Sequence, residues 1–144
     1  MSITSNTELL DIARRNNIKL DAVCTIYDDN ALRYLKSLNE YKAIILLSPS
    51  EQIMNGHWVA VMKYKHNTRK GIKTEHVYFD SFGIVPNKKI EKLFNNDFYS
   101  YNNVQIQKLS ANYCGIFSLM FLKYVKDKPS YFNFIEHYGK LNLF

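Results

Sequence analysis

The chain has 144 residues, of which 47% are hydrophobic and 22% are charged, and this composition excludes an intrinsically disordered or collagen-like protein. A chain of this length can bury a substantial core, so we expect residues 1–144 to form a single domain. The net charge of +6 favours acidic or polyanionic partners, DNA among them, and carries no information about the fold.

Two amphipathic helices are predicted in the first 41 residues. The segment SNTELLDIARRNN (5–17) has cap-type residues ahead of apolar residues at helical spacing. The segment DDNALRYLKSLNEY (28–41) repeats that pattern, with its alanine and its leucines on one stripe. Each helix is therefore expected to bury one face.

Three strands are predicted next, because the hydrophobic pattern changes. The segments KAIILLSP (42–49), HWVAVMKYK (57–65) and EHVYFDSFG (75–83) are short apolar or alternating runs. The polar segment HNTRKGIKT (66–74) is expected to be the hairpin connection between the second and third of these strands. The middle of the chain is thus predicted to form a sheet.

The rest of the chain, from residue 86, is predicted to contain three helices and a fourth strand. PNKKIEKLFNN indicates a short helix from residue 86, and NVQIQK (103–108) indicates the strand. Residues 114–125 are apolar on almost every side, which predicts a helix buried in the centre of the domain. Residues 128–140 are expected to form the last helix.

Neither a secretion signal nor a membrane span is expected. The start of the chain lacks the basic and apolar regions of a signal peptide, and the longest aliphatic run, AIILL (43–47), is far too short to cross a bilayer. We therefore expect a soluble, unsecreted protein with no membrane partner. In such a protein Cys24 and Cys114, the two cysteines, are expected to be reduced thiols.

Cys114 stands at the start of the predicted buried helix. The unpaired N–H groups and the positive dipole end at a helix start stabilise an anion, so this thiol is placed to ionise to a thiolate. From this segment alone, a cysteine that only packs in the core explains the sequence equally well. Other residues must therefore distinguish a nucleophile from a core residue.

A catalytic thiolate needs an imidazole and a group that orients its ring, and His57 and Asp80 are the candidates. His57 begins one predicted strand and Asp80 ends the next, so pairing of the two strands brings both residues to the same edge. His76 is a competitor, but four residues of extended chain place it about 13 Å from Asp80. Each residue alone is more often structural; together with Cys114 they predict a Cys-His-Asp arrangement.

Acyl transfer also requires hydrogen-bond donors that face the developing oxyanion. The backbone N–H of Cys114 supplies one donor at the helix start. Gln107 ends the predicted strand that leads to this cysteine, and its side-chain amide can supply the second. Gln105 lies two residues back on the same strand face, and the spacing does not separate the two glutamines.

The ordered set GHW, YFDSFG, a glutamine and NYCGIFSLMFL resembles the adenain-like branch of the papain-like cysteine peptidases, the adenovirus maturation protease family. SUMO and ubiquitin-like proteases are more distant relatives of that branch. The resemblance implies that His57 is the general base, Asp80 the orienting acid and Cys114 the nucleophile. It also favours Gln107, seven residues before the cysteine, over Gln105 as the oxyanion donor.

The resemblance covers residues 43 to 125 approximately and implies an α+β papain-like fold. In this fold the nucleophile begins a central buried helix that packs on a mainly antiparallel sheet. Relatives in virophages and Polinton-like viruses imply a viral protein. Two features depart from the adenovirus enzymes: Asp80 stands where they have Glu, and Cys24 does not match their cysteine that bonds to an activating peptide. Cys24 is expected to pack in the core.

The implied function is that of a thiol endopeptidase that cleaves viral structural precursors after glycine during virion maturation. Trp58 adds bulk beside His57, and Gly115 removes a side chain beside Cys114, which suits a narrow cleft that takes small substrate residues. Core packing explains Trp58 equally well.

The implied partners are capsid or core precursor proteins, with DNA as a further candidate, in the virion or the host cytoplasm. No metal or cofactor is expected, and activation by DNA or a peptide stays open. Three alternatives remain: a SUMO or ubiquitin-like deconjugating protease, a Yop-type acetyltransferase, and a non-enzymatic DNA-binding module.

Overall fold

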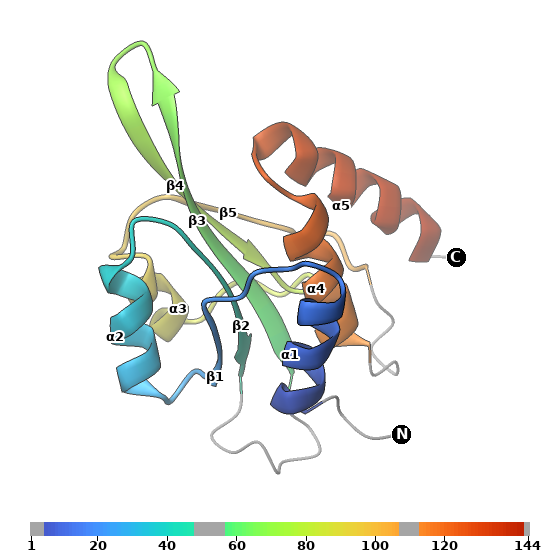
Figure 1. The fold of residues 1–144 in the computed structure, drawn as a ribbon. Coiled ribbons are helices and arrows are strands. Elements are labelled where there is room, and N and C mark those ends of the chain that lie inside the picture. Colours follow the sequence, from blue (N-terminus) through green and yellow to red (C-terminus); the bar gives the residue numbers. More distant parts are fainter. Residues whose placement is uncertain (1–4, 48–56, 107–112, 143–144) are drawn as a thin grey trace.

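The computed structural model describes residues 5–47, 57–106 and 113–142 (Figure 1). In chain order the helices and strands are α1 (Asn6–Arg15), β1 (Ala22–Thr25), α2 (Asp29–Ser37), β2 (Tyr41–Leu46), β3 (Trp58–Thr68), β4 (Gly71–Phe79), α3 (Lys88–Leu93), β5 (Tyr99–Tyr101), α4 (Cys114–Tyr124) and α5 (Lys128–Asn142). This combination of one sheet with helices confirms the expected α+β class.

The five strands form one sheet in the order β1-β2-β3-β4-β5. The central strand, β3, pairs antiparallel with both β2 and β4. The edge strands pair in parallel, β1 with β2 and β5 with β4. The antiparallel centre agrees with the expected sheet, whereas the two short parallel edges were not predicted.

Helices cover both faces of the sheet and enclose two buried clusters (Figure 1). The cluster shared with α1, α4 and α5 contains Trp58 and Phe79, and the cluster shared with α2 and α3 contains Leu35. Neighbouring strand residues alternate between the clusters, so that Ile44 belongs to the first and Ile45 to the second. Burial on both faces explains why the central strands read as continuous apolar runs.

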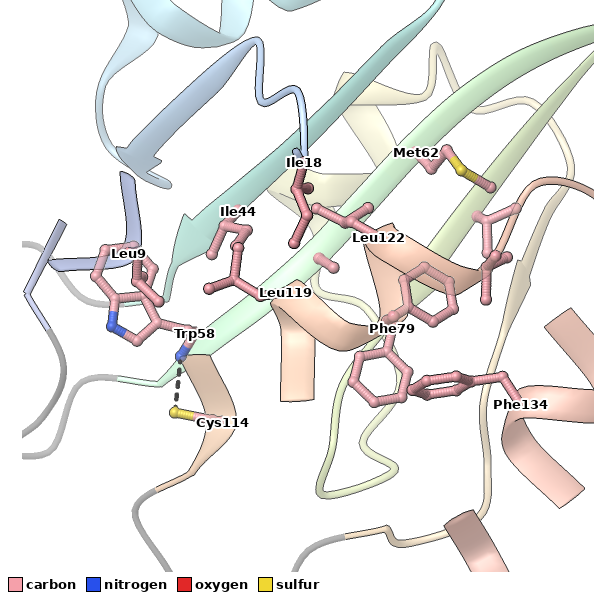
Figure 2. Close-up of a cluster of buried hydrophobic side chains, with 14 of the residues drawn as sticks. Leu9, Ile18, Ile44, Trp58, Met62, Phe79, Cys114, Leu119, Leu122 and Phe134 are labelled. Atoms are coloured by element: carbon pink, nitrogen blue, oxygen red, sulfur yellow. Dashed lines mark hydrogen bonds between the residues drawn. The ribbon is translucent and has the colours of Figure 1, made fainter. Parts of the chain in front are cut away.

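The predicted central helix is confirmed as α4. It contacts β3, β2, α1 and α5, and Figure 2 shows its residues Leu119 and Leu122 among side chains from α1 and the sheet. A helix surrounded in this way needs apolar residues on all sides, which is the pattern seen in its sequence. Among the described residues, no helix is long and apolar enough to cross a membrane.

The predicted connection at 66–74 is wrong, because most of it is strand. The β3–β4 ladder continues to the pair Thr68 and Gly71, so only two residues form the turn. β2 pairs with β3 only as far as Lys63, and β5 pairs with β4 only from His76, so the outer hairpin has no third strand. Most residues from 65 to 73 are polar because this part of the hairpin is exposed, and such polarity is typical of a loop.

The strand predicted at 103–108 is not found at residues 103–106, and residues 107–108 lie outside the described part of the chain. The edge strand is β5, which ends at Tyr101, and residues 103–106 have no strand pairing. Ile106 is buried and its N–H donates to the Ser81 carbonyl over 2.8 Å. Individual contacts of this kind, rather than a strand ladder, hold the segment. The short helix begins at Lys88 rather than at residue 86, because the Asn87 side chain caps it.

Candidate active site

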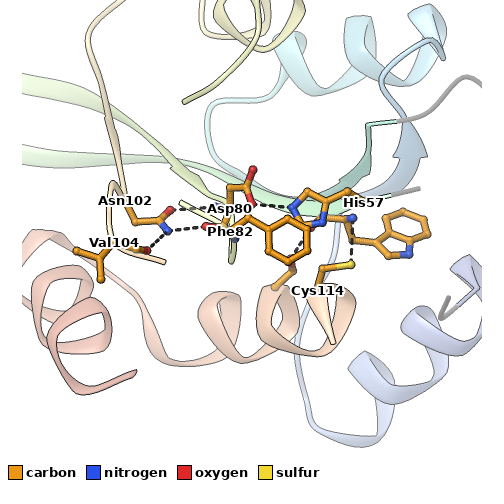
Figure 3. Close-up of polar contacts among 8 residues, drawn as sticks. His57, Asp80, Phe82, Asn102, Val104 and Cys114 are labelled. Carbon is orange, nitrogen blue, oxygen red and sulfur yellow. Dashed lines mark hydrogen bonds and ion pairs between the residues drawn. The ribbon is translucent and has the colours of Figure 1, made fainter. Parts of the chain in front are cut away.

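Three of the predicted site residues meet at the end of the sheet where β3 begins and β4 ends, hereafter the edge (Figure 3). His57 immediately precedes β3, Asp80 immediately follows β4, and Cys114 is the first residue of α4. Antiparallel pairing of Ala60 with Phe79 aligns the beginning of β3 with the end of β4. Because α4 packs against β3, its first residue reaches the same edge.

His57 and Asp80 form a short hydrogen bond, with 2.6 Å between Nε2 and Oδ1. The Asp80 side chain is 1% exposed and the His57 side chain 15% exposed, so little water competes for the contact. The same Oδ1 accepts the backbone N–H of Phe82 over 2.8 Å. A carboxylate oxygen held by a backbone donor gives the imidazole a fixed acceptor, and hence a fixed orientation.

The Cys114 sulfur lies where an anion is stabilised. The residue is only 6% exposed, and the backbone N–H of Trp58 donates to its Sγ over 3.4 Å (Figures 2 and 3). The N–H of Phe117 donates to the Tyr113 carbonyl over 2.9 Å and closes the first turn of α4. Amides earlier in that turn have no intrahelical acceptor, and they form the positive end of the helix dipole next to the sulfur.

The pKa of His57 is the net result of opposing effects. Burial lowers this pKa, whereas hydrogen bonds to Asp80 and Cys114, together with the charges of these two residues, raise it more and bring it to about 9. The ring therefore carries a proton at neutral pH. Since Nε2 faces Asp80, Nδ1 is the nitrogen that remains for Cys114. The arrangement places a protonated imidazole beside the Cys114 sulfur.

Two further residues complete this edge, and the sequence analysis singled out neither. The Phe82 ring stacks on His57 with 4.3 Å between ring centroids and 10° between the planes. The Asn102 side chain bonds to both the N–H and the carbonyl of Asp80. Phe82 lies two residues after Asp80 in the YFDSFG motif, and this position indicated that its ring lies near the site. Asn102 is 22 residues away in sequence, and no local pattern indicates its contact.

Trp58 and Gly115 pack in the core beside the candidate site. Trp58 is 2% exposed, and a Cβ atom added to Gly115 would lie 3.4 Å from its indole and 2.9 Å from a methyl group of Leu9. Gly115 therefore allows α1 and β3 to approach α4 closely. The packing explanation considered for Trp58 therefore fits both residues, and their contact with substrate stays a prediction.

The oxyanion donor stays a prediction. Gln107 lies outside the described residues, as do the other residues between Ile106 and Tyr113. Gln105 is described and half-buried, in the irregular segment that follows β5. The structure therefore does not compare the two glutamines.

The competing histidine and the second cysteine lie away from this edge. His76 is buried next to Phe94, and its Nε2 lies 3.4 Å from a carboxylate oxygen of Asp97. Cys24 is a free thiol in the cluster on the other face of the sheet. Burial, aided by the charge of Asp28, raises the pKa of Cys24 to about 12. Both have the surroundings of structural residues.

A large cavity among the described residues lies away from this edge. It has a volume of about 790 Å³ and is lined in part by Leu122 and Lys126, at the far end of α4 from Cys114. In residues 5–47, 57–106 and 113–142, no group of three or more His, Cys, Asp or Glu side chains is arranged to hold a metal ion. The sulfur, imidazole and carboxylate are the reactive groups that this edge brings together.

Comparison with known proteins gives a structural match but no sequence match. No family model and no curated protein matches the chain. The crystal structure of ASFV pS273R protease aligns over 97% of this chain with a TM-score of 0.55 and 14% identity. A selenomethionine crystal structure of that protease aligns over 72% of this chain and 42% of its own length, with 19% identity and a TM-score of only 0.43.

The alignment with a TM-score of 0.55 shows the fold. The chain has the architecture of a viral protease of the pS273R type, so the expected protease fold is confirmed. The chain spans 66% of the length of that protease. At 14% identity the comparison shows the fold alone, and the chemistry depends on the residues of the site.

Proposed function

We propose that this chain is a cysteine endopeptidase in which Cys114 is the nucleophile, His57 the acid and base, and Asp80 the residue that orients the imidazole. The observation that carries the proposal is the arrangement where β3 begins: Asp80 lies 2.6 Å from His57, and the Cys114 sulfur accepts the N–H of the adjoining Trp58 over 3.4 Å. A nucleophile, a base and a group that orients the base are the parts that acyl transfer requires. The fold shared with a viral protease supports the same reading.

In the first half of the proposed reaction, the Cys114 sulfur attacks the carbonyl carbon of the peptide bond. Protonated His57 then gives its Nδ1 proton to the leaving amine as the carbon–nitrogen bond breaks, and a thioester is left on the cysteine. In the second half, neutral His57 takes a proton from water, which attacks the thioester and releases the acid product and the thiolate. Asp80 stays ionised throughout and holds the ring.

The developing oxyanion requires donors near Cys114. The N–H of this residue is in the first turn of α4, where it has no intrahelical acceptor. We assign the second donor to the side chain of Gln107, on the basis of the motif resemblance and its seven-residue spacing. Two donors of this kind stabilise the charge that forms only in the transition state.

We further propose that the substrates are viral structural precursors, such as capsid or core proteins, and that cleavage follows glycine during virion maturation. The adenain-like order of motifs supports this, and so does a fold shared with a protease of ASFV. The site of action would then be the virion or the viral factory in the cytoplasm.

DNA is the further partner that we propose, and the β3–β4 hairpin favours it. Residues 65–73 are all exposed, carry four Lys or Arg side chains and contain no acidic residue. Figure 1 shows that this hairpin projects from the rest of the molecule. The major groove of DNA admits a two-stranded β-ribbon, and phosphates attract its positive charge. DNA would bring the enzyme to substrates that coat it.

The test is cleavage of peptides that contain one glycine, with the products identified by mass spectrometry. We expect cuts after glycine by the wild-type chain and none by Cys114→Ala. Release of a ubiquitin-like protein from a Gly-Gly linkage, without cleavage of ordinary peptides, would replace the maturation protease by a deconjugating enzyme. Acetyl transfer from acetyl-CoA without hydrolysis would replace it by an acetyltransferase. If the wild type catalyses no reaction of any kind and Cys114→Ala binds DNA as well as the wild type does, the chain is a DNA-binding module instead.

A further inference from the structure

We propose that Asn102 is a positioning residue for the site, because its side-chain amide fixes the backbone of Asp80 and thereby the direction of the Asp80 carboxylate. This inference rests on the proposed function in one respect: the orientation matters for catalysis only if His57 acts on Cys114. Asn102 does not touch the reacting atoms. It acts through Asp80.

Asp80 lies just beyond the end of the regular sheet. The last pair between β4 and β5 joins Tyr78 to Tyr101, so the backbone of Asp80 has no strand partner on the β5 side. Asn102 supplies one: its Oδ1 accepts the Asp80 N–H over 2.9 Å, and its Nδ2 donates to the Asp80 carbonyl over 2.5 Å. The side chain thus continues the hydrogen bonding of β5 for one more residue, as Figure 3 shows.

The same amide also holds the segment that follows β5. Its Nδ2 donates to the Val104 carbonyl over 3.1 Å, and two residues later the Ile106 N–H donates to the Ser81 carbonyl over 2.8 Å. The turn at 80–83 and the segment at 102–106 are therefore joined at two points. Asn102 links the acid of the site to the part of the chain that leads to Gln107.

The turn at 80–83 is held by its own hydrogen bond and packs closely on the segment that follows β5. The Gly83 N–H donates to the Asp80 carbonyl over 2.8 Å, and Gly83 has a φ of +73°. A Cβ atom at Gly83 would lie 3.0 Å from the carbonyl carbon of Val104. With the backbone fixed by this turn and by Asn102, the Phe82 N–H meets Oδ1 of Asp80, the same oxygen that faces His57.

Burial makes these bonds hard to replace. Asn102 is 2% exposed and Asp80 is 1% exposed, so water does not reach the Asp80 N–H in place of the amide oxygen. A side chain without an acceptor at position 102 leaves that N–H unsatisfied. The local backbone would then shift to find a partner, and the carboxylate would move relative to the His57 ring.

Two variants of Asn102 test the inference against a matched control. Asn102→Ala removes all three side-chain hydrogen bonds. Asn102→Ser keeps a hydroxyl that can accept the Asp80 N–H, and it serves as the test if the alanine variant does not fold. Asn103→Ala is the control, because Asn103 is the adjacent residue and is exposed. All variants are first shown to be folded by circular dichroism at the assay temperature.

The decisive readout is the titration of the His57 ring, followed by NMR on the folded protein, because a residue that only adds stability does not change it. In the wild type and in Asn103→Ala we expect a pKa for His57 near the high value of about 9. In the Asn102 variants we expect it to move toward 6.5, with kcat for peptide cleavage lower by about 100-fold and KM little changed. The serine variant should be intermediate.

The outcomes separate this inference from the proposed function. An unchanged His57 titration and an unchanged kcat per folded molecule in both Asn102 variants would overturn the positioning role, even if the wild type cleaves peptides. A shifted titration in a chain that cleaves nothing would support the positioning of Asp80 and refute the peptidase proposal instead.

Discussion

His57 lies between a carboxylate that holds its ring and a sulfur that can give up a proton. The 2.6 Å contact to Asp80 and the stacked ring of Phe82 restrict the imidazole to one orientation. Cys114 meets the backbone N–H of Trp58 and the first turn of α4. The raised pKa of His57 therefore places a protonated ring beside this sulfur.

The two cysteines are expected to differ strongly in reactivity. Burial and Asp28 raise the pKa of Cys24 to about 12, whereas Cys114 lies beside an imidazole that is protonated at neutral pH. Because the thiolate is the reactive form, iodoacetamide at pH 6 to 7 should label Cys114 well before Cys24. Peptide mass mapping over time measures this. Equal labelling, or faster labelling of Cys24, would contradict the nucleophile assignment.

The raised pKa of His57 also predicts how stability depends on pH. In the folded chain this pKa is about 9, above the ordinary 6.5, so the protonated ring stabilises the fold fully below pH 6.5 and this contribution is lost as pH rises to 9. The contribution amounts to about 3 kcal/mol at most. Urea unfolding of wild type and His57→Gln at pH 6 and pH 9.5 measures it. The difference between the two proteins should shrink at the higher pH; a constant or growing difference would show that the ring is not held protonated.

The identity and order of the residues predicted that the thiol, imidazole and carboxylate of the site meet. They did not predict the side chains that hold these three groups in place. His57 and Asp80 could be paired because each stands at the end of a recognisable strand, and Cys114 because it begins an apolar helix. The stacking of Phe82 and the amide of Asn102 depend on where the turn and β5 lie in three dimensions, which no local pattern encodes.

At the scale of elements, the site depends on how closely α4 approaches its neighbours. Gly115 is the second residue of α4, and an added Cβ would lie 2.9 Å from Leu9 of α1. Ser118, one turn later, donates to the Trp58 carbonyl over 3.4 Å and ties the helix to β3. The packing that holds α1 and β3 against α4 therefore also sets the position of Cys114.

Gly115→Ala should lower the free energy of unfolding by about 1–3 kcal/mol, because the new methyl group overlaps the Leu9 side chain. Leu9→Ala alone should lower it by about 2–5 kcal/mol through the cavity that it leaves. The double variant should lose less than the sum of the two, because the smaller residue at position 9 makes room. Urea unfolding of all four proteins measures the coupling. Additive losses would show that the two residues are not in contact.

Helices and strands with a clear apolar pattern were predictable from the sequence, and short or exposed strands were not. The helices α1 and α2 follow their apolar patterns and side-chain caps, and α4 follows its apolar pattern. β2 is apolar because both of its faces are buried. β1 and β5 have four and three residues, too few to show a period, and they are held by parallel pairing to longer strands. The outer part of the β3–β4 hairpin contacts no core, so its sequence lacks the apolar face that marks a strand.

At the scale of the whole molecule, the sheet and its two helical layers give the architecture of ASFV pS273R protease over 97% of this chain. The fold class followed from the sequence because helical and strand patterns alternate in it. The sequence pattern does not show which surface meets a partner, and the projecting hairpin became visible only in three dimensions (Figure 1).

Charge on the hairpin is expected to govern DNA binding. Replacing Arg69, Lys70 and Lys73 by Gln should weaken binding to duplex DNA at least tenfold at low salt and flatten the salt dependence, because fewer phosphates are neutralised. Lys36, Lys88 and Lys92 are exposed on α2 and α3, and replacing them by Gln removes the same charge as a control. Fluorescence anisotropy measures both. Equal losses in the two triple variants would mean that only net charge matters.

The central claim is that Cys114 forms an acyl-enzyme with the help of His57. The most direct measurement is mass spectrometry of the intact chain during a single turnover of an activated glycine ester, with the modified residue located by peptide mapping. We predict a transient acyl adduct on Cys114 in the wild type, none in Cys114→Ala, and formation slowed at least 1,000-fold in His57→Ala. An adduct on another residue, or one that forms equally fast without His57, would contradict the account.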